Sequence, residues 1–164
     1  MSATSEVPIP EDAQAERVVA VCMAESARGA RLALERVAPS DFWHPPCRRV
    51  AQAVADHAAH LAAVEMAAAA GQHTDGRLNA VATLARVERR TLDEWAADAP
   101  VAVDQDGRYA GRVRNAAIRR REMALASKIH VAAARDDPQR FVLALELGRL
   151  VAEETAGAGH TVGA

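Results

Sequence analysis

Apolar positions recur three or four residues apart along most of this chain, which is the spacing of one face of an α-helix. The clearest stripe contains Leu78, Val81, Leu84 and Val87. Prolines, glycines and short polar segments interrupt the pattern at intervals and divide it into separate helices. The pattern predicts an all-α protein, in which a compact helical head is followed by a long antiparallel helical hairpin.

The head is expected at residues 10–104, after a flexible leader at 1–9. Its expected helices cover residues 10–27, 30–37, 47–60, 61–70 and 78–87, and a short segment that contains Leu92 and Trp95. Thr91 and Glu94 have the spacing of a capping box, which predicts that this last helix starts at Thr91. Phe42 and Trp43 are expected to anchor the core of the head, because the chain has few other aromatic residues.

The hairpin is expected at residues 105–154, followed by a flexible, glycine-rich tail at 155–164. Its first arm, residues 109–134, has no proline and no glycine after Gly111. Asp137 and Pro138 then have the order of an N-cap and a first helical residue, which predicts a restart of the helix there.

The second arm of the hairpin has apolar side chains around most of its circumference. A helix of this kind needs cover on more than one side, and a single partner helix supplies only one. Burying six large apolar side chains contributes on the order of 10 kcal/mol, so leaving half of them in water is costly. The pattern therefore predicts self-association into a homodimer or a higher oligomer. The residues assigned to it are Ile118, Leu125, Ile129, Phe141, Leu145, Leu147 and Leu150.

Composition agrees with helix packing and argues against a strongly charged partner. About forty of the 164 residues are alanine, the best helix former. A net charge of −2 gives no global attraction to nucleic acid or to an anionic membrane. The chain has two cysteines, no signal-peptide pattern and no apolar segment long enough for a bilayer, so a cytoplasmic location with reduced thiols is expected.

Three motifs, in order, resemble the N-terminal domain of the DnaB-type replicative helicases. They are Pro10 followed by Ala15-Glu16-Arg17, then Pro39-Ser40-Asp41-Phe42-Trp43 with Cys47-Arg48, and then Tyr109-Ala110-Gly111-Arg112-Val113-Arg114 with Arg119-Arg120. The resemblance extends from about Pro8 to Glu154, although Cys47 stands where the family usually has histidine. It implies a helical head and hairpin that pair into dimers and dock primase or other replication proteins. In the family the motor is a separate ATPase domain.

No constellation for catalysis or for a cofactor is found. A phosphate-binding loop needs glycines before its lysine, and the only lysine, Lys128, lies within an expected helix. His44, Cys47, His57 and His60 lack the spacing of a standard zinc module. We interpret them as a histidine at a helix start, a buried thiol and two surface histidines. The sequence thus predicts neither an enzyme nor a metal protein.

Arginines gather at the start of the hairpin, where Arg112, Arg119 and Arg120 are candidates for contact with a partner or with DNA. They spread around the helix, which favours a salt-bridged surface over direct nucleic-acid binding. The first hypothesis is therefore a non-enzymatic interaction module that docks a replication protein such as a helicase or primase. The alternative is a small DNA-binding regulatory protein that uses the arginine-rich helix.

Overall fold

The computed structural model describes residues 12–72, 76–99 and 107–158, with side chains as far as Glu154. These residues form helices joined by short turns and contain no strand, so the predicted all-α class is confirmed. The expected leader at 1–9 and residues 159–164 of the expected tail lie outside the described part, as do residues 100–106, which include the expected boundary between head and hairpin.

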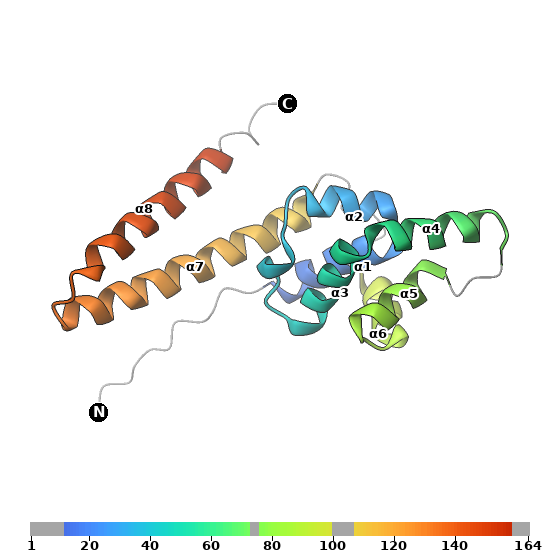
Figure 1. The fold of residues 1–164 in the computed structure, drawn as a ribbon, viewed down its shortest axis with the longest axis horizontal. Coiled ribbons are helices and arrows are strands. Elements are labelled where there is room, and N and C mark those ends of the chain that lie inside the picture. The colour runs from blue at the N-terminus through green and yellow to red at the C-terminus, as the bar shows by residue number, and fades with distance from the viewer. Residues whose placement is uncertain (1–11, 73–75, 100–106, 159–164) are drawn as a thin grey trace. The chain divides into compact units, whose positions relative to one another are not determined.

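Eight α-helices and one short 3-10 helix make up the described chain (Figure 1). They are α1 (Ala13–Glu25), α2 (Ala27–Leu34), η1 (Pro39–Asp41), α3 (Pro45–Asp56), α4 (Ala58–Ala69), α5 (Gly76–Ala85), α6 (Arg89–Asp98), α7 (Arg108–Ala134) and α8 (Gln139–Ala158). The chain divides into two compact units, a head unit at Glu11–Arg114 and a hairpin unit from Asn115 onward. The first turns of α7 belong to the head unit, where Ala110 and Val113 are buried in its core.

Two helices of the head unit begin at residues that differ from the sequence prediction. α2 begins at Ala27 rather than at residue 30, because the Ser26 hydroxyl accepts a hydrogen bond from the Gly29 amide at 3.0 Å. The predicted capping box at Thr91 is wrong. α6 begins at Arg89, which places Thr91 inside its first turn, and the Glu94 carboxylate instead pairs with Arg90 at 2.8 Å.

The core of the head unit is built from alanine and valine around a few larger side chains. Phe42, Met23, Leu61 and Leu92 are the largest apolar side chains among those that are fully buried. The predicted role of Phe42 as a core anchor is therefore confirmed. That of Trp43 is wrong, because 40% of its surface is exposed. Small side chains let α1 and α2 approach closely, and a Cβ at Gly29 would stand 2.3 Å from the carbonyl oxygen of Cys22.

A fully buried carboxylate, that of Glu16 on α1, holds the start of α3. Its two oxygens accept hydrogen bonds from the backbone amides of Trp43 at 2.8 Å and His44 at 2.9 Å. Pro45 and Pro46 follow and have no backbone N–H group. The Glu16 carboxylate therefore accepts hydrogen bonds from the last backbone N–H groups before α3. Burial, together with the nearby Glu16 charge, raises the pKa of the Cys47 thiol to about 12. This cysteine is therefore a packed thiol rather than a nucleophile.

A second buried charge, Arg77 on α5, joins the ends of two helices. Its guanidinium donates to the carbonyl oxygen of Met23, near the end of α1, at 3.0 Å. It also lies 3.6 Å from the Glu65 carboxylate, which accepts a hydrogen bond from the Ala27 amide at the start of α2. Burial lowers the pKa of Arg77, and Glu65 opposes that shift. The pair thus neutralises opposite helix ends inside the head unit.

Candidate interaction surface on the helical hairpin

The hairpin unit consists of the long α7 and the returning α8, which lie antiparallel in Figure 1. The predicted restart is confirmed, since the Asp137 carboxylate accepts a hydrogen bond from the Gln139 amide at 2.9 Å. An ion pair between Arg140 and Asp136 also stabilises the turn between α7 and α8. α8 continues to Ala158, beyond the end expected at Glu154.

One row of side chains on α8 is partly covered within a single chain. Leu143, Leu147 and Leu150 recur at helical spacing and are half-buried. On α7, Leu125 and Ala132 are buried and Ile129 is half-buried. These residues form the inner face of the hairpin.

The opposite side of α8 leaves large apolar side chains in water. The exposed fractions are 62% for Phe141, 65% for Val142 and 72% for Leu145. Phe141 and Leu145 are one helical turn apart and face away from the row of half-buried leucines. The guanidinium of Arg140 covers part of the Phe141 ring, with its central carbon 4.9 Å from the ring centre. Among the described residues, the hairpin thus presents an apolar strip that is mostly exposed to water.

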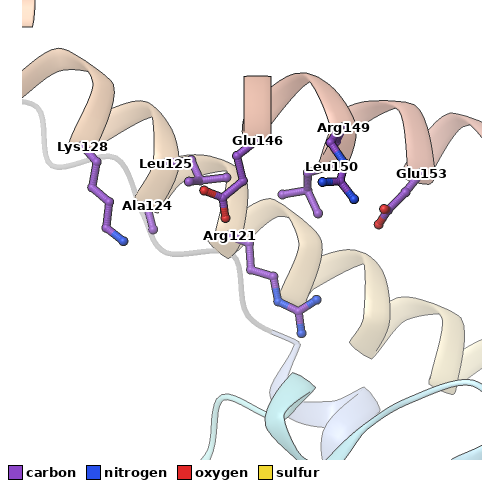
Figure 2. Close-up of a pocket in the computed structure, with 8 residues that line it drawn as sticks. All are labelled: Arg121, Ala124, Leu125, Lys128, Glu146, Arg149, Leu150 and Glu153. Atoms are coloured by element: carbon purple, nitrogen blue, oxygen red, sulfur yellow. The ribbon is translucent and has the colours of Figure 1, made fainter. Parts of the chain in front are cut away.

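A groove of about 410 Å³ runs along one flank of the hairpin, between α7 and α8 (Figure 2). Leu125 and Leu150 lie between the two helices along this groove. Charged side chains border it, and they are Arg121 and Lys128 from α7 and Glu146, Arg149 and Glu153 from α8. An apolar floor between charged borders is typical of a protein-docking surface rather than of a catalytic centre.

Two carboxylates meet across the hairpin at the end of the groove. Glu122 of α7 shares a hydrogen bond with Glu154 of α8. Partial burial and the neighbouring Glu154 charge raise the pKa of Glu122, and Arg119 opposes the shift. Two acids in hydrogen-bond contact repel each other when both are ionised and attract when one of them holds a proton.

We expect this pair to make the hairpin more stable in acid. Because the pKa of Glu122 is higher in the folded chain than the usual 4.5, the folded state holds its proton more tightly. This gain in folding stability is complete below pH 4.5 and is lost as the pH rises through the raised pKa of Glu122. Thermal unfolding followed by circular dichroism should show Glu122→Gln to be less dependent on pH than the natural chain. Equal pH dependence in both would contradict the pairing.

The seven side chains predicted to mediate self-association differ widely in exposure. Ile118 and Leu125 are already buried in one chain, whereas Phe141 and Leu145 are the most exposed of the set. Ile129, Leu147 and Leu150 are half-buried. Val131 and Val142 are also exposed, at 45% and 65%, and the sequence does not identify them, because residue spacing alone does not tell which flank of a hairpin is exposed.

The three candidate arginines do not form one group. Arg112 lies in the head unit, where its Nε donates to the Asp12 carboxylate at 2.6 Å and its guanidinium stands 5.3 Å from the centre of the Tyr109 ring. Arg119 and Arg120 lie in the hairpin unit, the first exposed and the second half-buried. Arg112 is therefore committed to a contact within its own unit.

Neither a metal-binding cluster nor a membrane span is present among the described residues. No group of three or more histidine, cysteine, aspartate or glutamate side chains is placed to hold an ion among them. Over the same residues, no helix combines the length and the apolar content that crossing a bilayer requires.

Comparison with solved structures finds the same fold in a helicase domain. The chain is similar to the N-terminal domain of the DnaB helicase from Mycobacterium tuberculosis, with a TM-score of 0.66 and 20% sequence identity. The match covers 89% of this chain and 99% of that domain. No family profile matches the sequence, and no curated relative matches it either. The fold expected from the three motifs is thereby confirmed.

Proposed function

We propose that this chain is a non-enzymatic protein–protein interaction module that acts in the cytoplasm during DNA replication. It self-associates through its C-terminal hairpin, residues 105–154, as a homodimer or higher oligomer. Its head, residues 10–104, and its hairpin together dock a replication protein, a helicase or primase. It uses no cofactor or metal.

The exposed apolar strip on α8 carries this proposal. Phe141, Val142 and Leu145 each leave more than 60% of their surface in water within one copy. Contiguous exposed apolar side chains of this size are characteristic of protein interaction sites. The replication context is supported by the fold, which is similar to that of the N-terminal domain of a DnaB helicase.

Affinity capture tests the docking partner. Tagged chain is incubated in a lysate of its own host after nuclease treatment, and bound proteins are identified by mass spectrometry. We expect a replicative helicase or a primase to be enriched over a tag-only control. The finding of neither protein would contradict the replication role.

A DNA shift assay at low salt separates this proposal from the alternative. An interaction module is expected to leave the DNA unshifted. Tight binding that falls steeply with salt, and that is lost in the Arg119→Glu, Arg120→Glu double variant, would instead favour the DNA-binding regulator.

A further inference from the structure

A pocket in the head unit lies between α2, the start of α4 and the start of α5. Its volume is about 350 Å³, which falls within the range of small-molecule sites, roughly 300–1,000 Å³. The residues that line it are Ala27, Ala30, Arg31, Leu34, Glu35, Ala58 and Arg77. The three alanines leave room for a ligand, because each of their side chains is a single methyl group.

One face of α2 forms most of the pocket wall. Ala27, Ala30 and Leu34 recur at helical spacing on this face, with Ala30 buried and the other two half-buried. Arg31 and Glu35 lie one turn apart on the same face and are exposed. The pocket therefore has an apolar wall and one charge of each sign at its opening.

The buried charged residue of the pocket is Arg77, whose side chain is only 5% exposed. Its Nη2 donates a hydrogen bond to the carbonyl oxygen of Met23 at 3.0 Å. Its Nε and Nη1 have no hydrogen-bond partner among the described residues. Buried nitrogens of a charged group are costly without an acceptor, so this guanidinium retains the capacity to bind an anion.

Glu65 compensates the charge of Arg77 only in part. Its Oε2 lies 3.6 Å from Nη1 of Arg77, which is too far for a hydrogen bond, and its side chain is 39% exposed. The same oxygen accepts a hydrogen bond from the Ala27 amide at 2.8 Å. Burial lowers the pKa of Arg77 although Glu65 opposes that shift. A further anionic acceptor beside the guanidinium would therefore stabilise its charge.

We propose that this pocket binds a small aliphatic carboxylate, with the anionic group paired to Arg77 and the hydrocarbon chain against Ala30 and Leu34. One buried guanidinium matches a single negative charge. A doubly charged phosphate fits less well, because the nearby carboxylates of Glu35 and Glu65 repel its second charge. The site lies wholly within the head unit and does not depend on the proposed self-association.

Nuclear magnetic resonance of the isotope-labelled natural chain tests the site with hexanoate, hexylammonium and hexanol, which have equal chain length. Hexanoate should bind with a dissociation constant on the order of 1 mM, as expected for a ligand of this size. It should shift the amide signals of Ala30 and Leu34 and the Nε–H signal of Arg77. Hexylammonium should shift none of them, and hexanol should bind at least about tenfold more weakly. Equal binding of hexanoate and hexanol, or no binding of hexanoate, would overturn the proposal.

A matched pair of variants, Ala58→Phe and Ala59→Phe, locates the bound hexanoate without changing the buried Arg77. Both alanines are exposed at the start of α4, but Ala58 lines the pocket and Ala59 does not. Ala58→Phe should fill the pocket and weaken hexanoate binding at least about tenfold. Ala59→Phe should bind hexanoate like the natural chain, and circular dichroism should show both variants to be folded. Equal binding by the two variants would place hexanoate outside the pocket and contradict the assignment.

Discussion

Leu145→Asp is expected to turn the self-associated chain into a monomer. Leu145 is 72% exposed in one copy, so the substitution costs the isolated fold little. In a dimer the same side chain is covered, and burying a leucine contributes about 2 kcal/mol. A two-fold interface contains the substitution twice, and an aspartate there also loses hydration. A loss of at least about 4 kcal/mol weakens association roughly a thousandfold.

The measurement is sedimentation velocity across a concentration series, with Met66→Asp as the matched control. Met66 on α4 is 74% exposed and lies in the head unit, so its substitution should leave association unchanged. Unchanged association of the Leu145→Asp chain would show that the apolar strip of α8 is not the contact surface.

Glu16→Ala is expected to produce the largest loss of stability of any single substitution in a charged residue of the head unit. The carboxylate is fully buried and accepts the amides of Trp43 and His44. Hydrogen bonds to a charged group contribute about 1.5–3 kcal/mol each. Removing both, and leaving two amides unpaired before α3, should lower the free energy of unfolding by about 3–5 kcal/mol. A small domain has only about 5–15 kcal/mol in total.

Thermal and urea unfolding measure this effect, with Glu25→Ala as the control on the same helix. Glu25 is exposed, and its removal should change the free energy of unfolding by less than about 0.5 kcal/mol. The Glu16→Ala chain should melt at least about 10 °C lower. Equal melting of the two variants would mean that Glu16 does not hold the start of α3.

The hairpin could be predicted well because its signals are local. A proline-free segment between a linker and Asp137-Pro138 determines α7 and the restart of α8, and each signal acts within a few residues. That α8 has more apolar side chains than one neighbouring helix can cover likewise follows from the sequence, because it needs only the positions of the apolar residues around a single helix. Exposed Phe141 and Leu145 agree with that count.

The role of Glu16 could not be predicted, because its partners lie 27 and 28 residues away along the chain. The same is true of Arg77, whose partner Met23 is 54 residues away. A glutamate on an otherwise apolar stripe gives no indication of a remote amide that needs an acceptor. Trp43 shows the reverse error, since an aromatic residue next to the buried Phe42 turns out to lie at the surface.

Within the predicted self-association set, sequence spacing could not separate inner from outer positions. Leu125 and Leu145 have equal hydropathy, yet one is buried and the other is 72% exposed. Which side of an apolar helix meets its neighbour depends on the turn that joins the two arms and on the angle between them. Those are properties of the folded pair rather than of either segment.

The most direct test of the account is the molar mass of the natural chain in solution. Light scattering coupled to size exclusion, at tens of micromolar, should give at least twice the 17.4 kDa of one chain, and a smaller value on dilution. A mass of 17.4 kDa at every concentration would show that the apolar strip of α8 stays in water, and would contradict the central claim.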